Sequence, residues 1–248
     1  GGFVHYRDPK DIVIKVGISF TSVEGARKNL GEVKAFDFDG IGREAKEKWN
    51  KMLGRIEIGE GERERKEVFY TALYHSLIAP NVFSDVDGRY TGMDGRVHTG
   101  EHYTVFSLWD TFRALHPLLA LVYPERNEVF IRSLLEKYEQ SGFLPIWELA
   151  NYETNCMIGI HSIPVIVDGY FKNLEMDTDL AYEAVKKSLM KGPQKQDGFE
   201  YYLSLGYLPA DGVDESVSKT LEFCYNDWCM AQLAGALGKK EDFEYFMN

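Results

Sequence analysis

One stretch decides the fold class, Val217-Ser-Lys-Thr-Leu-Glu-Phe-Cys-Tyr-Asn-Asp-Trp-Cys-Met-Ala-Gln-Leu-Ala-Gly-Ala-Leu237. It predicts one long helix, because it runs without a turn signal into Gly238, the residue type that commonly ends helices. Apolar residues lie nearly all round this helix. A helix of that kind packs against neighbours on more than one side.

Working outward from this helix, the hydrophobic spacing predicts a series of further helices. Six of them are given by their ranges: 42–56, 64–79, 104–123, 154–171, 180–189 and 199–205. The helix at 104–123 is expected to break near Pro117. Two more helices are expected to begin at Pro124 and at Glu241. In the helix at Pro124, the residues expected to face inward are Phe130, Leu134, Leu135 and Tyr138. In the helix at 64–79, the expected apolar stripe is Val68, Phe69, Ala72, Leu73, Ser76 and Leu77. Residues 81–101 form a long Gly- and Asp-rich loop, and loops of that length are usually functional.

The start of the chain has a different period. From residue 11 to residue 20 apolar side chains fall on every second position, from Ile12 to Phe20. This alternation predicts a half-buried strand. A lone strand is not stable, so we expect its sheet to come from other sequence or from a partner. The predicted fold class is mostly α, with antiparallel helix pairs around a centre, as in an α/α toroid.

Composition excludes several classes of function. The 248 residues carry a net charge of 28 − 39 = −11, which argues against nucleic acid and anionic membranes as partners. No apolar run reaches the length of a membrane span. Cys156, Cys224 and Cys229 form no Cys-x-x-Cys pair and are expected to be buried thiols. The Gly1-Gly2 start shows no signal peptide, lacks Met, and is not expected to be a natural beginning.

Three acids stand beside tryptophans: Trp109-Asp110, Trp147-Glu148 and Asp227-Trp228, all expected near element ends. An indole packs on the C–H face of a sugar, and a carboxylate accepts hydrogen bonds from its hydroxyl groups. The pairs therefore suit a carbohydrate site, although such neighbours also arise by chance.

Other polar groups have competing interpretations. Residues 151–155, Asn-Tyr-Glu-Thr-Asn, gather side chains that could bond to hydroxyl groups, and a helix N-terminus explains only part of this. The loop at 85–95 is either an oxygen-rich metal loop or, more simply, a solvated turn. His116 and His161 lie among apolar residues and are expected to be core histidines.

Four long motifs resemble the family 92 glycoside hydrolases. They begin at Asp87 (Asp-Gly-Arg-Tyr-Thr-Gly-Met-Asp-Gly), Tyr103 (Tyr-Thr-Val-Phe-Ser-Leu-Trp-Asp-Thr-Phe-Arg), Gly142 (Gly-Phe-Leu-Pro-Ile-Trp-Glu-Leu-Ala-Asn-Tyr-Glu-Thr-Asn-Cys-Met-Ile-Gly) and Glu215 (Glu-Ser-Val-Ser-Lys-Thr-Leu-Glu-Phe-Cys-Tyr-Asn-Asp-Trp). Asn226 is a departure, since the family usually has Tyr-Asp-Asp-Trp at this point. The resemblance covers essentially the whole chain.

The resemblance implies an inverting, calcium-dependent exo-α-mannosidase that acts on terminal α-mannosides of glycans, such as α-1,2 linkages of N-glycans or mannans. It implies a β-sandwich remnant over residues 1–35, a helical linker over 36–60 and the first part of an (α/α)6 toroid over 61–248. The family is commonly exported, which implies a secreted or periplasmic protein.

The resemblance also implies which residues meet the sugar. Asp110 matches a substrate-binding acid, supported by Trp109 and Arg113. The segment with Glu148, Asn151, Glu153 and Asn155 is expected to line or brace the same pocket. The Glu-Gly-Asn and Gly-Asn-Asp-Asp motifs of the general acid and base do not occur. The catalytic groups and most calcium ligands are thus expected beyond residue 248, and the remainder of the same chain is an expected partner.

Two alternatives stay open. The chain could be a carbohydrate-binding or inactive remnant of such an enzyme. It could also belong to another α/α-toroid glycosidase, in which Asp110 and Glu148 are themselves the acid and the base.

Overall fold

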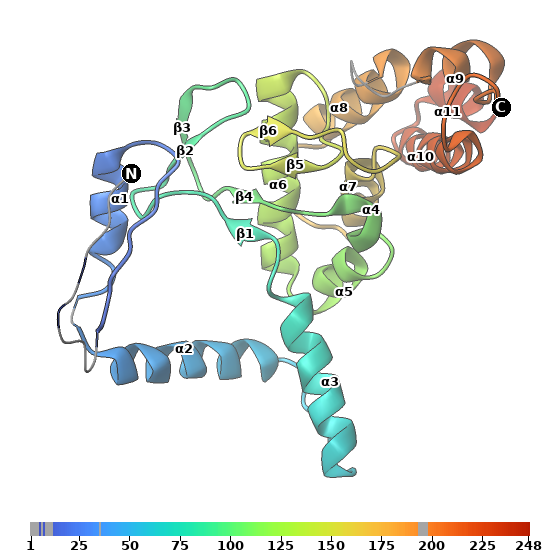
Figure 1. Cartoon of the computed structure of the whole chain (residues 1–248). Helices are drawn as coiled ribbons and strands as arrows, with labels where there is room; N and C mark the ends of the chain where they lie inside the picture. Colours follow the sequence, from blue (N-terminus) through green and yellow to red (C-terminus); the bar gives the residue numbers. More distant parts are fainter. Residues whose placement is uncertain (1–4, 6, 8–11, 35, 193–197) are drawn as a thin grey trace.

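A computed structural model describes residues 5, 7, 12–34, 36–192 and 198–248, and these residues are mostly helical, as predicted (Figure 1). The helices are α1 (Val23–Leu30), α2 (Phe38–Leu53), α3 (Arg63–Ser76), α4 (Leu108–Thr111), α5 (Leu115–Val122), α6 (Pro124–Ser141), α7 (Ser162–Phe171), α8 (Thr178–Lys191), α9 (Phe199–Leu205), α10 (Ser216–Ala236) and α11 (Lys240–Met247). The strands are β1 (Asn81–Val82), β2 (Arg89–Thr91), β3 (Val97–Thr99), β4 (Tyr103–Thr104), β5 (Glu148–Leu149) and β6 (Tyr152–Glu153). They pair antiparallel as β1 with β4, β2 with β3 and β5 with β6.

Helix α6 forms the centre of the helical part (Figure 1). Pro124 occupies its first turn, and Gly142 ends it with a φ of 88°, a backbone conformation that glycine adopts without steric cost. The four side chains predicted to face inward, Phe130, Leu134, Leu135 and Tyr138, are all buried. Helices α5, α7 and α8 pack against α6, and α10 packs against α7, α8 and α11.

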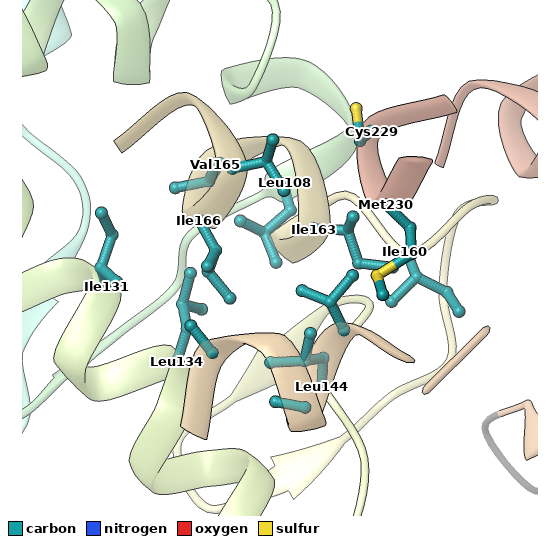
Figure 2. Packing of buried hydrophobic residues seen from close by; sticks show 14 of the residues in the cluster. Leu108, Ile131, Leu134, Leu144, Ile160, Ile163, Val165, Ile166, Cys229 and Met230 are labelled. Atoms are coloured by element: carbon teal, nitrogen blue, oxygen red, sulfur yellow. The ribbon is translucent and has the colours of Figure 1, made fainter. Parts of the chain in front are cut away.

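The core lies between α6, α7 and α10 (Figure 2). Leu134 of α6, Ile166 of α7 and Met230 of α10 are fully buried in it, and Leu108 of α4 joins them. Each such side chain contributes about 1.5–3 kcal/mol relative to an exposed one. This packing fixes α4 and the start of α7 beside α10.

Two of the predicted helices begin later than the spacing indicated. In place of the predicted helix 104–123, the structure has the end of β4, a turn, and the helices α4 and α5. The two helices are separated at residues 112–114 and not at Pro117. Pro117 lies in the first turn of α5, where proline is tolerated. The predicted helix 154–171 begins only at Ser162, because Asn155, Met157 and Gly159 all have positive φ. A right-handed helix cannot include such residues.

The described residues 12–19 belong to no strand, and the sheet partners that the prediction places in other sequence are not among the described residues, so the strand stays a prediction. Exposure alternates along this segment, but the apolar face that was expected to be buried is the exposed one. Lys15, Gly17 and Ser19 are half-buried, whereas Val16 is 74% and Ile18 is 68% exposed. Helix α1 covers the Gly17 side, where an added Cβ would meet the carbonyl oxygen of Ala26. Residue 11 lies outside the described part of the chain.

Three smaller expectations also change. The stripe of α3 is only partly covered, since Leu73 is buried but Val68 and Ala72 are exposed. All three cysteines are free thiols, but only Cys229 is buried, and Cys156 and Cys224 are exposed. The predicted loop 81–101 contains β1 and the β2–β3 hairpin. No helix of the described residues has the length and apolar character needed to cross a membrane.

Candidate functional site

Three segments distant in sequence meet at one place. The first is the turn after β4 with α4, residues 104–113. The second runs from the β5–β6 hairpin to residue 161. The third is the first half of α10. Contacts between Glu148 and the backbone of Val105, and between Trp109 and Glu222, join these segments.

Glu148 joins the hairpin to the turn after β4. Its carboxylate accepts hydrogen bonds from Thr104 Oγ1 at 2.9 Å and from the backbone N–H groups of Val105 and Phe106, both at 3.2 Å. The side chain is 1% exposed. Burial raises its pKa, and the buried ammonium of Lys137 opposes that shift. A carboxylate enclosed in this way braces the site rather than facing a ligand.

The backbone around Glu148 is strained. Val105, Ser107, Ala150, Asn155 and Met157 all have φ between 48° and 68°. Non-glycine residues rarely adopt this region, and a β-branched residue such as Val105 does so at particular cost. Strained residues persist where surrounding contacts hold them, and they cluster at functional sites. The turn after β4 is therefore held in one shape by Glu148.

That turn presents three of the predicted residues. Asp110 of α4 is exposed, and its carboxylate accepts a hydrogen bond from Ser107 Oγ at 2.8 Å. Arg113 is exposed and lies over the rings of Phe112, 4.7 Å away, and Trp109, 5.8 Å away. Together they offer a carboxylate, a guanidinium and an indole to the solvent side, a set that can hold a polyhydroxylated ligand.

Glu222 of α10 is a site residue that the sequence interpretation missed. Its Oε1 accepts from Trp109 Nε1 at 3.1 Å and from Arg113 Nη2 at 2.8 Å. Its Oε2 lies 3.0 Å from Nε2 of His161. The sequence signal was an acid with Asn226 one turn later on a helix that also carries Lys219 and Asp227, but a partner more than a hundred residues away leaves no local pattern.

The remaining predicted residues lie on the hairpin and the chain after it. Glu153 accepts hydrogen bonds from the backbone N–H groups of Ile146, Trp147 and Asn155 at 2.8–3.0 Å, so it shapes the loop. Asn151 and Asn155 are half-buried. The structure thus gives Glu148 and Glu153 bracing contacts, and it brings Trp109 and Arg113 together through Glu222.

The two histidines are buried, as predicted. His161 stacks on Phe112 at 4.2 Å, and burial lowers its pKa to about 4. Asn226, fully buried, donates its amide toward His161 Nδ1 at 3.4 Å and accepts from the backbone N–H of Ile160 at 2.8 Å.

The third tryptophan–acid pair lies elsewhere. Asp227 and Trp228 are in the middle of α10, not at an element end. They line a separate cavity of about 430 Å³ together with Tyr202, whose hydroxyl donates to Asp227. Burial raises the pKa of Asp227 to about 6.

The described residues contain no cluster of metal-binding side chains. They contain no group of three or more His, Cys, Asp or Glu side chains that could hold a metal. In the acidic loop, Asp85 accepts from Ser19 and Asn29, Asp87 pairs with Lys28, and Asp94 contacts His98. Asp85 and Asp87 thus attach the N-terminal segment, and Asp94 makes a contact within the loop; because Asp85 is only 5% exposed, the solvated-turn prediction is wrong at this residue.

Comparisons with known proteins agree on one family. A model of the glycosyl hydrolase family 92 catalytic domain matches residues 25–248. A family GH92 alpha-mannosidase from Bacteroides thetaiotaomicron is 41% identical with a TM-score of 0.86, over 92% of this chain and 31% of that one, and has also been solved in complex with mannoimidazole. A GH92 inverting mannosidase from the same species is 38% identical, with a TM-score of 0.85, over 92% of this chain and 32% of that one.

A curated relative from Arthroderma benhamiae, described as an uncharacterized secreted glycosidase, is 28% identical over 97% of this chain and 30% of its own. The chain therefore spans about 30% of the length of the relatives that it matches.

Proposed function

Because the chain belongs to glycosyl hydrolase family 92, we propose that it forms the sugar-holding part of an inverting exo-α-mannosidase. Asp110 would accept hydrogen bonds from the hydroxyl groups of a terminal mannose, with Trp109 and Arg113 beside it. Glu148 and Glu153 would brace this wall, and Asn151 and Asn155 would line it. The substrates would be terminal α-mannosides of N-glycans or mannans, with α-1,2 linkages as the first choice.

The observation that carries the proposal is the 41% identity to a family GH92 alpha-mannosidase over 92% of this chain. Its complex with mannoimidazole, a mannose-shaped inhibitor, supports mannose as the sugar. The exposed carboxylate of Asp110 next to an indole and a guanidinium supplies the chemistry that a sugar requires.

The general acid, the general base and most calcium ligands would come from outside these residues. The described side chains do not form a metal site on their own, so the proposed calcium dependence belongs to the assembled enzyme. We also propose the division into residues 1–35, 36–60 and 61–248, the completion of an (α/α)6 toroid, and export, which the description of the fungal relative supports.

The geometry favours this proposal over a glycosidase that uses Asp110 and Glu148 as acid and base. A general acid must reach the glycosidic oxygen, whereas Glu148 is buried and already accepts three hydrogen bonds. A remnant that only binds sugar remains the second candidate, and the activity assay distinguishes it.

The proposal is tested in the complete protein that contains this chain. We expect hydrolysis of 4-nitrophenyl α-mannoside and α-1,2-mannobiose, release of β-mannose as the first product by NMR, and loss of activity with EDTA that calcium restores. Mannose binding without hydrolysis would support the sugar-binding remnant. Activity that EDTA leaves unchanged would refute the calcium requirement.

Asp110→Ala tests the sugar-holding wall in the same protein. Loss of a charge-assisted hydrogen bond, about 1.5–3 kcal/mol, raises KM roughly tenfold or more and lowers kcat if the contact tightens in the transition state. Asp179→Ala, which removes an exposed acid in the first turn of α8, is the control. Equal kinetics for the two variants would remove Asp110 from the site.

A further inference from the structure

Glu222 is the point at which α10 meets the proposed sugar-binding wall. One carboxylate oxygen holds both Trp109 Nε1, at 3.1 Å, and Arg113 Nη2, at 2.8 Å. The side chain is 16% exposed, so it is screened from solvent by its neighbours. Trp109 and Arg113 flank Asp110 in sequence, and a shared acceptor fixes the relative position of both side chains.

The other oxygen of Glu222 faces His161, and the neighbours of His161 determine where its proton lies. Asn226 Oδ1 accepts from the Ile160 N–H, so its Nδ2 must be the atom that faces His161 Nδ1 at 3.4 Å. An amide NH₂ only donates, which makes Nδ1 the acceptor. The single proton of neutral His161 is thus on Nε2, which lies 3.0 Å from Glu222 Oε2 as a close electrostatic contact outside hydrogen-bond geometry.

His161 stays neutral in this environment. Burial lowers its pKa to about 4, although Glu222 opposes the shift and Arg113 adds to it. Among the described residues, the charged and titratable groups placed against Glu222 are the cation Arg113 and the neutral imidazole of His161. Glu222 is therefore the carboxylate that joins Trp109 and Arg113 on this face of the wall.

We propose that Glu222 is a positioning residue, which holds Trp109 and Arg113 in place for the sugar, and that Asn226 acts through the tautomer of His161 to orient Glu222. The proposal rests on the proposed function, because the sugar is what the wall would hold. It adds a chain of contacts from the buried part of α10, through His161, to the open side of the site.

The first test replaces the carboxylate in the complete protein. Glu222→Ala leaves two donors without an acceptor, so we expect KM for 4-nitrophenyl α-mannoside to rise about 10- to 100-fold. The crystal structure of this variant should show Trp109 and Arg113 displaced. Glu200→Gln is the control, because Glu200 lies exposed on α9, and its KM should equal that of the wild type.

The second test uses a compensating pair. In Glu222→Gln the new amide turns an N–H toward the N–H of His161, so the side chain is pushed away and KM rises about tenfold. Adding Asn226→Asp supplies an acceptor for His161 Nδ1. The proton of His161 then moves to Nδ1, and its Nε2 accepts a hydrogen bond from the amide of Gln at position 222. We therefore expect the KM of the double variant to return most of the way to the wild-type value.

The outcomes separate the two proposals. A double variant no better than Glu222→Gln would overturn the role of Asn226 and His161. Wild-type KM in Glu222→Ala would overturn the positioning role. If the wild-type protein hydrolyses no α-mannoside, the proposed function fails, while the crystal structure of Glu222→Ala still tests whether Trp109 and Arg113 depend on Glu222.

Discussion

His116 shows how one buried residue makes stability depend on pH. It is 1% exposed on α5, and its Nδ1 lies 3.0 Å from Oδ1 of Asn127 on α6. Because the amide oxygen is an acceptor, Nδ1 carries the proton. Nε2 has no hydrogen-bond partner among the described residues, so a second proton there would be buried without compensation.

The first prediction follows from the direction in which burial shifts the pKa of His116. Burial lowers the pKa of His116 to about 4, against about 6.5 in an unfolded chain. Between these pH values the unfolded state binds a proton that the folded state does not, so the free energy of unfolding falls as pH decreases from about 6.5 to 4. Full stabilisation is present above pH 6.5.

His116→Leu should therefore flatten this part of the profile. The variant is less stable at pH 7, by about 1–3 kcal/mol, because Asn127 loses its donor. Its Tm should nevertheless fall less between pH 7 and pH 4.5 than that of the wild type. The prediction is wrong if Tm falls by the same amount in both proteins between pH 7 and pH 4.5.

At the scale of elements, Glu148 and Lys137 hold the turn after β4 against α6. Lys137 is fully buried, and its Nζ donates to the carbonyl oxygen of Tyr103 at 2.5 Å and contacts His102 Nε2 at 2.9 Å. Burial lowers the pKa of Lys137 to about 8, and the charge of Glu148 counteracts that effect. The strained turn with Val105 thus depends on a buried pair of opposite charges.

The second prediction concerns Glu148→Gln. The amide keeps one acceptor oxygen where the carboxylate used two, and it leaves Glu136 as the remaining opposite charge near Lys137. Breaking a buried pair in this way costs about 3–5 kcal/mol. Glu153→Gln, which also loses backbone hydrogen bonds but faces no buried lysine, should cost less in thermal and denaturant unfolding. The double variant Glu148→Gln with Lys137→Met should lose less unfolding free energy than the two single variants lose in sum. Additive losses would refute an interaction between Glu148 and Lys137.

Elements marked by local signals could be predicted, and those set by distant partners could not. Helix α9 matches the predicted 199–205, and α10 differs from its predicted limits by one residue at each end. Helix α7 begins late, because positive φ at Asn155 and Met157 is imposed by the surrounding loop. The strand prediction at 11–20 depended on a partner that the described residues do not supply.

The candidate site divides in the same way. Trp109 and Asp110 stand out in sequence because an indole beside a carboxylate is a visible pair. Glu222 does not, because its importance comes from contacts with Trp109 and Arg113, which precede it by more than one hundred residues. Glu148 was predicted to line or brace the pocket, and its burial favours the bracing alternative of that prediction.

At the scale of the molecule, apolar surface is unevenly covered. The core around α6, α7 and α10 is buried, whereas several other regions leave large apolar side chains exposed. Among them are the N-terminal segment, with Val16, Ile18 and Phe20, and the end of α9 with the start of α10, with Leu205 and Leu221. Where exposed apolar side chains adjoin, they are typical of surface that other polypeptide covers.

The last prediction compares residues 1–248 alone with the complete protein. Since the relatives are about three times longer and these apolar faces lack cover, the isolated segment should bind the dye ANS strongly, associate at micromolar concentration and hydrolyse no α-mannoside. Ile14→Lys with Ile18→Lys should reduce association of the segment, because charge on an exposed edge opposes pairing. Asn50→Lys with Thr71→Lys, at exposed positions of α2 and α3, adds the same charge and is the control. A monomeric, active segment would contradict the proposal that the catalytic groups come from outside these residues.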